Sequence, residues 1–251
     1  MNYLIRLILG LSLLTVPLTW ADDLIDLDDL LDIDDLSDEV SSSGQSAEIA
    51  DPFEGINRAI YGFNDFAYKE LFEPFTKGYV NVVPQTAREG IGNFFNNLEF
   101  PTRFAGILLQ FRFGRASQEA GKFLVNTTAG FAGFMNVAPE FDGLNPPIED
   151  VGQAFGAWGI DHGFYIVVPF IGPSSLRDFV GRFGGRAVDP IPEPWTQIDD
   201  DGARFALQAT DLINDLPDII DVYNKITEPA IDSYAAVRDG YAQLRAARVA
   251  E

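Results

Sequence analysis

The chain has 251 residues and a formal net charge of -21, with 38 Asp and Glu against 17 Lys and Arg. This excess of acid argues against a nucleic-acid partner and against electrostatic attraction to anionic lipid headgroups, because both need clustered basic residues. Phe accounts for 21 residues against 8 Tyr and 3 Trp. Because a phenyl ring has no polar group, the excess of Phe indicates either an apolar core or a lipid-facing surface.

The sequence contains no cysteine. Disulfide bonds, thiolate metal sites, a cysteine nucleophile and a thioether-linked lipid anchor are therefore excluded. After the N-terminal segment no apolar run reaches about 18 residues, so no conventional transmembrane helix is expected in the rest of the chain.

The first 21 residues have the pattern of a secretion signal. One positive charge precedes an apolar run over residues 7–16, and Thr19 and Ala21 are small residues at the −3 and −1 positions of a cut before Asp22. The apolar run is shorter than the roughly 20 residues that a membrane span needs. A cleaved signal peptide is therefore predicted, with an uncleaved membrane anchor as the alternative.

Residues 22–50 are predicted to be an acidic, disordered tract followed by a linker. Residues 22–39 hold ten acidic residues and no basic one, and a Ser-rich stretch follows. Clustered carboxylates repel one another, which favours a solvated tail. A docking peptide with Leu and Ile anchors, or weak calcium binding, are the alternatives, although the tract lacks the Gly and the distal Glu of an EF-hand.

A folded region is expected from Asp51 onward. The sequence Asp-Pro-Phe-Glu at 51–54 predicts a helix start, with Asp51 as the N-cap and Glu54 completing a capping box. Apolar residues then recur every three or four positions as far as Leu71. Pro74 is expected to end this helix, and residues 79–83 are expected to be extended or to form a short link that ends at Pro84.

The remainder is predicted to be mainly helical, with little or no β structure. Residues 164–168 have the composition of a strand but no obvious partner nearby, so an extended segment is expected there, with residues 79–83 as the candidate partner. Ser174 or Ser175 is expected near the cap of a short helix. The further helices are expected over 84–98, from Pro101, over 112–125, 173–181, 202–216, 218–227 and 229–249.

Little in the sequence indicates an active site. The sole histidine, His162, lies beside Asp161, and one His is too few for an ordinary zinc site. Ser174 and Ser175 lie in a Gly-Pro-Ser-Ser-Leu segment that is not the G-x-S-x-G elbow of hydrolases. We predict a protein that is not an enzyme and that uses no metal or cofactor.

Six ordered motifs resemble one family, the VacJ/MlaA family of outer-membrane phospholipid-transport proteins. The motifs are DPFEGINR at 51–58, NFFNNLEFP at 93–101, FLVNTTAG at 123–130, EDVGQAFGAWG at 149–159, GFYIVVP at 163–169 and GPSSLRD at 172–178. The resemblance indicates one helical domain over 51–251, with a motif-matching core at 51–190 and C-terminal helices at 191–251.

The resemblance implies a fold and a function. The fold would be a ring-like assembly of short amphipathic helices that lie in the membrane plane around a small amphipathic pore. The protein would sit on the periplasmic, inner-leaflet side of a Gram-negative outer membrane. It would remove mislocalised phospholipids from the outer leaflet and pass them to a periplasmic lipid-carrier protein, in association with an outer-membrane porin trimer.

The missing cysteine departs from the lipoprotein pattern of many family members. Membrane attachment is then expected from the folded body, since a Phe-rich face of a few hundred Å² contributes several kcal/mol at about 25 cal/mol per Å². Ordinary soluble core is the alternative use of the same stripe. The candidates for lipid or membrane contact are Phe53, Ile56, Ile60, Phe63, Phe94, Phe95, Phe104 and Leu108.

The Gly-rich stretches are expected to bend the chain around a passage. The candidates for pore-lining or bend positions are Gly130, Gly133, Gly152, Gly156, Gly159 and Gly163. Two alternatives remain for the function. One is a porin-associated adaptor without transport of its own, and the other is a secreted hydrolase that uses Ser174 or Ser175.

Overall fold

The computed structural model describes residues 48–191, 198 and 200–250. The signal peptide and the acidic tract predicted from the sequence lie outside these residues. The described chain is mainly helical and contains one two-stranded sheet, which confirms the mainly α prediction. In chain order the elements are α5 (Glu54–Phe66), the π-helical segment η1 (Ala67–Phe72), α6 (Glu73–Val82), α7 (Gln85–Leu98), α8 (Phe100–Leu109), α9 (Phe113–Thr128), the 3-10 segment η2 (Ala138–Glu140), α10 (Val151–Ala157), β1 (Tyr165–Val168), β2 (Gly172–Ser175), α11 (Leu176–Arg186), α12 (Asp201–Thr227) and α13 (Ser233–Ala250).

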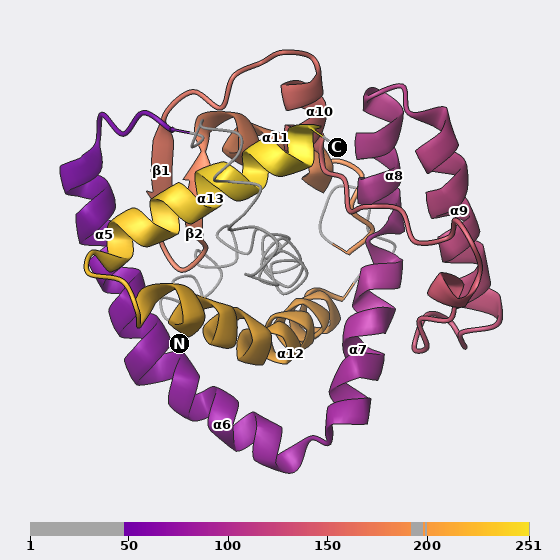
Figure 1. The fold of residues 1–251 in the computed structure, drawn as a ribbon. Coiled ribbons are helices and arrows are strands. Elements are labelled where there is room, and N and C mark those ends of the chain that lie inside the picture. The colour runs from indigo at the N-terminus through magenta and orange to yellow at the C-terminus, as the bar shows by residue number, and fades with distance from the viewer. Residues whose placement is uncertain (1–47, 192–197, 199, 251) are drawn as a thin grey trace.

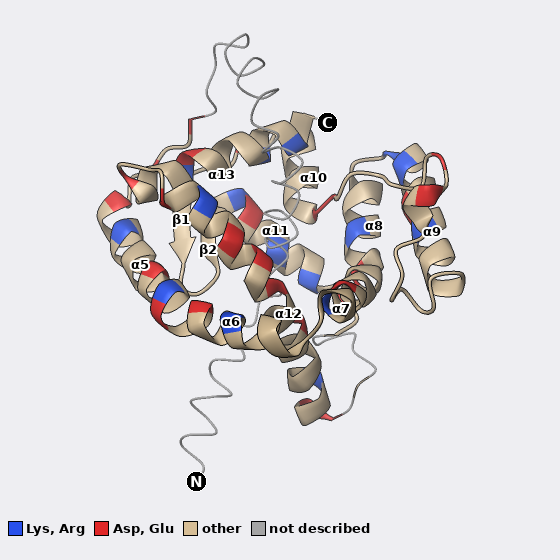
Figure 2. Cartoon of the chain, turned by 60° about the horizontal axis from the view of Figure 1, so that its bottom comes forward, with Lys and Arg blue, Asp and Glu red and all other residues tan. Residues whose placement is uncertain are grey.

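The helices follow one another around a ring (Figure 1). The α5 and α6 helices form its left and lower edge in this view, and α7 and α8 form its right edge. The α10 and α11 helices and the hairpin lie along the upper edge, α12 and α13 cross the inner side, and α9 packs outside α8. Figure 2 shows bands of basic and acidic residues along α11, α12 and α13.

The first long helix does not end at Pro74. The α5 helix passes into η1 and then into α6, and the Glu73 N–H donates to the Tyr68 carbonyl five residues earlier. Pro74 falls in the first turn of α6, where a missing N–H is tolerated because the hydrogen-bond register restarts there. The helix continues to Val82, so the extended segment predicted at 79–83 is wrong.

The predicted capping box at the start of α5 is also wrong. The helix begins at Glu54 behind Phe53, without a side-chain cap. The Asp51 carboxylate instead accepts hydrogen bonds from Asn57 Nδ2, at 2.8 Å, and from the Tyr234 hydroxyl. Tyr234 lies in α13, so the Asp51 carboxylate links the start of α5 to the C-terminal helix and does not cap α5.

The strand predicted near 164–168 exists as β1, but its partner is β2. The two strands pair antiparallel, with Tyr165 opposite Ser175 and Val168 opposite Gly172. The residues expected to start a short helix at 173 therefore belong to a strand. The α11 helix begins one residue after Ser175, whose hydroxyl accepts a hydrogen bond from the Asp178 N–H at 3.1 Å, which confirms a serine cap.

A single helix replaces the two that were predicted on either side of Pro217. The α12 helix runs from Asp201 to Thr227 with Pro217 inside it. Leu216 and Ile219, close to the proline on both sides, are buried. Burial of these neighbours outweighs the cost of a missing hydrogen bond, so the helix continues.

Candidate functional site

The inner side of α5 carries two buried amides beside Ile60 and Tyr61, which pack against the core. Asn57 and Asn64 are each only 3% exposed. The Asn57 side chain donates to the Tyr165 carbonyl and accepts from the Val167 N–H, both at 3.0 Å. Asn64 donates in the same way to the Val168 carbonyl at 2.9 Å. These amides satisfy the free edge of β1, and they place a polar stripe of α5 toward the protein.

The side of α5 next to these amides exposes large apolar residues. Phe53 and Phe63 are 46% exposed, and Ile56 is 62% exposed. Phe66 continues this face toward η1 and is also exposed. Ile60 is half-buried and packs against the cluster around Tyr165. We call Phe53, Ile56, Phe63 and Phe66 the outer stripe. A helix of a soluble protein normally buries its large apolar residues, whereas these four are exposed.

The other candidates for lipid contact differ in their surroundings. Phe95 is buried, so it is part of the interior and was wrongly assigned to an outer face. Phe94 is partly buried and stacks on Phe134 with ring centroids 4.8 Å apart. Phe104 is also partly buried, and Leu108 is exposed. Leu108 of α8 is therefore an exposed candidate for lipid contact, separate from the outer stripe.

The six glycine candidates have three local roles. Gly130 and Gly133 lie in the turn after α9, and Gly159 and Gly163 have positive φ in the loop before β1. Gly152 and Gly156 lie inside α10, so they do not bend the chain. A Cβ on Gly181 of α11 would lie 2.5 Å from the Gly152 nitrogen, which makes glycine necessary where the two helices meet.

Buried ion pairs join α10, α11 and α13. Arg245 of α13 binds Asp150, the N-cap of α10, at 2.6 Å and Asp178 of α11 at 3.0 Å. Arg177 also contacts Asp178, at 2.9 Å, and Tyr241 donates its hydroxyl to the same carboxylate. Burial alone would raise the pKa of Asp178, but Arg245 and Arg177 hold this pKa well below its ordinary value. Local sequence patterns do not reveal this network, because Asp150, Asp178 and Arg245 are distant in the chain.

A second buried carboxylate ties the chain before α10 to the region around α8 and α9. Glu149 accepts from Arg112 at 2.7 Å, from Arg115 at 2.6 Å and from the Gln110 amide. Only 1% of Glu149 is exposed. These contacts hold the segment that leads into α10.

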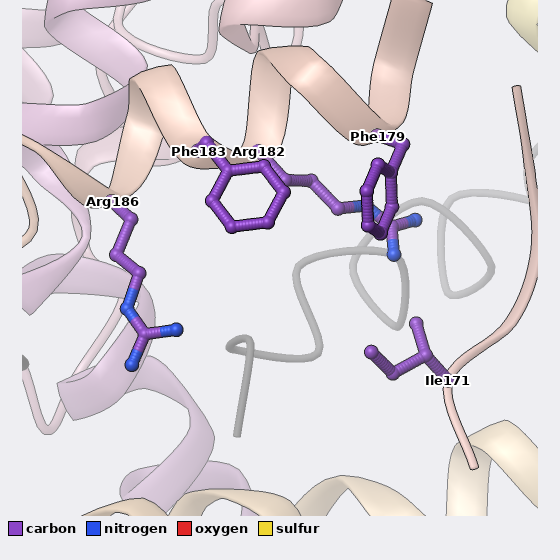
Figure 3. Close-up of a pocket in the computed structure, with 5 residues that line it drawn as sticks. All are labelled: Ile171, Phe179, Arg182, Phe183 and Arg186. Atoms are coloured by element: carbon purple, nitrogen blue, oxygen red, sulfur yellow. The ribbon is translucent and has the colours of Figure 1, made fainter. Parts of the chain in front are cut away.

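The face of α11 opposite this packing lines a pocket in the middle of the ring. Figure 3 shows Arg182 and Arg186 pointing into the same space, beside Phe179 and Phe183, with Ile171 on the other side. The three- and four-residue spacing of the α11 residues puts them on one helix face. Neither arginine was among the residues predicted for the site, although two basic residues four positions apart, alternating with Phe179 and Phe183, indicate one shared helix face.

The serines and the histidine that were considered for catalysis do not come together in a site. Ser174 and Ser175 are fully buried in β2, and Ser175 caps α11. His162 Nε2 lies 3.4 Å from Asp161 Oδ1 at the surface. Within the described residues, no group of three or more His, Asp or Glu side chains is placed to hold a metal ion. No described helix is both long and apolar enough to cross a membrane.

Comparisons with known proteins agree with one another. An uncharacterized protein of Rickettsia bellii is 27% identical over 80% of this chain and 78% of its own length. The intermembrane phospholipid transport system lipoprotein MlaA of Shigella flexneri is 29% identical over 81% of this chain and 80% of its own length.

The comparison with solved structures gives the same result. A structure described as the structural basis for maintenance of bacterial outer membrane lipid asymmetry matches with a TM-score of 0.66 and 25% identity, over 80% of this chain and 99% of the other. The family model for the MlaA lipoprotein matches residues 49–248. The resemblance seen in the motifs and the prediction of a protein that is not an enzyme are thereby confirmed. The chain belongs to the MlaA lipoprotein family.

Proposed function

We propose that this protein transports phospholipids between membranes and so maintains the lipid asymmetry of the outer membrane. It removes mislocalised phospholipids from the outer leaflet and passes them to a periplasmic lipid carrier. Family membership supports this function, since the relative in Shigella flexneri is named for intermembrane phospholipid transport. The observation that carries the proposal is the α5 helix, which buries Asn57 and Asn64 and exposes the outer stripe.

The α5 helix is suited to a position between the protein and the lipid. The amides face strand β1, which supplies hydrogen-bond partners, and the apolar side chains face outward. We place the outer stripe among the acyl chains of the inner leaflet, with the helix lying along the membrane plane. At about 25 cal/mol per Å², each phenyl ring buried in lipid contributes on the order of 2 kcal/mol. Attachment of this kind needs no acyl chain on a cysteine, which this sequence lacks.

Transport on this account is partition and not catalysis. A phospholipid needs a polar path for its headgroup and an apolar environment for its acyl chains. Arg182 and Arg186 of α11 line a pocket in the middle of the ring (Figure 3), and the outer stripe is exposed on α5. We propose that the headgroup passes through the middle of the ring while the membrane and the carrier set the direction. The Gly159 and Gly163 loop remains our candidate for backbone that borders this path.

The test measures outer-leaflet phospholipid in intact cells. Phosphatidylethanolamine at the cell surface is labelled with a membrane-impermeant amine reagent in the parent, in a deletion strain and in a complemented strain. We expect more label after deletion and the parental level after complementation. Equal labelling in all three strains would contradict transport. That outcome, with the protein still co-purifying with a porin trimer, would favour a porin-associated adaptor.

A further inference from the structure

The pocket on the inner face of α11 holds two arginines that form no ion pair with any described carboxylate. Arg182 and Arg186 lie four residues apart, with Phe179 and Phe183 on the same face and Ile171 opposite (Figure 3). None of these five residues is acidic. In a chain with 38 acidic and 17 basic residues, two neighbouring arginines with no carboxylate among the described residues that line their pocket require an explanation.

Other arginines of the described chain bind carboxylates closely. Arg103 binds Glu119 at 2.8 Å, and Arg245 binds Asp150 at 2.6 Å. Among the described residues, neither Arg182 nor Arg186 forms an ion pair or a side-chain hydrogen bond, and Nη1 of Arg182 is buried without a partner. A buried, unpaired guanidinium nitrogen is costly, and a bound anion would remove that cost.

The neighbouring titratable groups do not replace this anion. Burial raises the pKa of Tyr68 despite the opposing effect of Arg182, so this phenol stays neutral. Its hydroxyl donates to the Phe170 carbonyl. Asp189 and Arg186 attract each other electrostatically, but no ion pair or hydrogen bond joins their side chains in the described structure. The Asp189 carboxylate is buried and accepts a hydrogen bond from the Ile191 N–H. Both guanidinium groups therefore keep donors for a ligand.

The chemistry of the pocket indicates the ligand class. A guanidinium presents a planar set of donors that fits phosphate oxygens in pairs. The phenyl rings and Ile171 offer apolar contact beside these donors, which inorganic phosphate does not need. A zwitterionic headgroup would bring an ammonium group close to two guanidiniums. We infer that Arg182 and Arg186 bind the phosphodiester of a glycerophospholipid and favour headgroups of net negative charge. This inference rests on the proposed function, and it names the preferred substrate class.

The test is calorimetric titration of the full chain with short-chain lipids below their micelle concentration. Dihexanoyl phosphatidylglycerol, dihexanoyl phosphatidylethanolamine and inorganic phosphate are compared. We expect phosphatidylglycerol to bind at least about tenfold more tightly than the other two, as for one charge-assisted contact. The double variant Arg182→Gln/Arg186→Gln should lose this preference.

A matched control removes two positive charges elsewhere. Lys77 and Lys225 are exposed and pair with acids one helical turn away, so Lys77→Gln/Lys225→Gln should keep the preference. Thermal unfolding of each variant reports whether the fold persists. If the glutamine double variant does not fold, Arg182→Lys replaces it, because lysine keeps the charge but loses the planar donors. This variant should still weaken phosphatidylglycerol binding several-fold.

Each outcome separates the inference from the proposed function. Unchanged phosphatidylglycerol binding in a folded arginine variant would overturn the assignment to these residues. Inorganic phosphate that binds as tightly as the lipid would overturn the assignment to a lipid headgroup. Arginine-independent binding of both lipids would overturn only the inference, whereas no binding of either lipid by the unaltered chain would contradict the proposed function itself.

Discussion

The α5 and α11 helices flank the same β-hairpin, yet they use their two faces in opposite ways. The α5 helix turns its amides inward to β1 and leaves its phenyl rings exposed. The α11 helix buries small and ion-paired residues against α10 and α13, and turns phenyl rings and arginines toward the middle of the ring. Apolar periodicity identifies both helices as amphipathic. It does not tell which face meets protein, lipid or ligand.

The largest predicted effect concerns the ion pairs behind α11. Replacing Asp178 with Ala leaves Arg245 and Arg177 buried with one carboxylate fewer, so we expect the free energy of unfolding to fall by about 3–5 kcal/mol. Asp232→Ala is the control, since it removes an acid that pairs with Arg58 at the surface and should change stability much less. Denaturant titration measures both. Equal losses for the two variants would show that the Asp178 network does not hold α11.

The same carboxylate predicts how stability depends on pH. The pKa of Asp178 is below its ordinary value of 3.8, so its contribution is present above that value and is lost as the pH falls through the lowered pKa. Between about pH 5 and about pH 3, the free energy of unfolding should fall more steeply for the unaltered chain than for Asp178→Asn. If the free energy of unfolding falls equally with pH in the two proteins, Asp178 is not the source of this pH dependence.

A smaller effect is expected on the inner face of α5. Asn64→Ala removes the donor to the Val168 carbonyl and the acceptor for the Phe170 N–H, at 2.9 and 2.7 Å. Leaving these buried backbone groups unpaired should cost about 2–3 kcal/mol of unfolding free energy. Asn93→Ala, which removes a long exposed hydrogen bond, is the control and should cost little. If both variants are equally stable, the amides do not fix α5 against the hairpin.

The closest approach of α10 and α11 gives the smallest of these losses. Gly181→Ala would bring a methyl group to 2.5 Å from the Gly152 nitrogen, and we expect a loss of about 1–3 kcal/mol. Gly240→Ala meets nothing within 4 Å inside α13, so it should raise stability by a few tenths of a kcal/mol up to about 1 kcal/mol. Thermal unfolding distinguishes the two directions. A Gly181 variant as stable as the Gly240 variant would mean that the helices can separate at no cost.

The sequence predicts the helical class and most of the helices because each carries a regular apolar stripe. It misplaces helix ends and strand pairs where contacts between distant residues determine them. Pro74 and Pro217 are both accommodated inside helices, because a π-helical register or buried neighbours compensate for the lost donor. The partner of β1 depends on the path of the hairpin and not on strand composition. Local patterns cannot reveal such compensation.

The candidate site was predictable to different degrees in its two parts. The outer stripe follows from helical spacing, and only Phe95 among the eight apolar candidates is fully inside the protein. The arginine pocket depends on which face of α11 turns inward. The hydrogen bond between Arg245 and Asp178, which are 67 positions apart, fixes that orientation. The family motifs predict the fold through resemblance, but they do not identify the side chains that face the middle of the ring.

The central claim is that the outer stripe attaches this chain to lipid, and membrane fractionation with alkaline washing tests it most directly. Ile56→Asp/Phe63→Asp places two charges on the outer stripe, whereas Ile231→Asp places one at a fully exposed position between α12 and α13. We predict that the unaltered chain and the Ile231 variant stay in the membrane fraction, while the stripe variant is released as folded protein. Retention of the stripe variant, or release of the unaltered chain as a lipid-free monomer, would contradict the account.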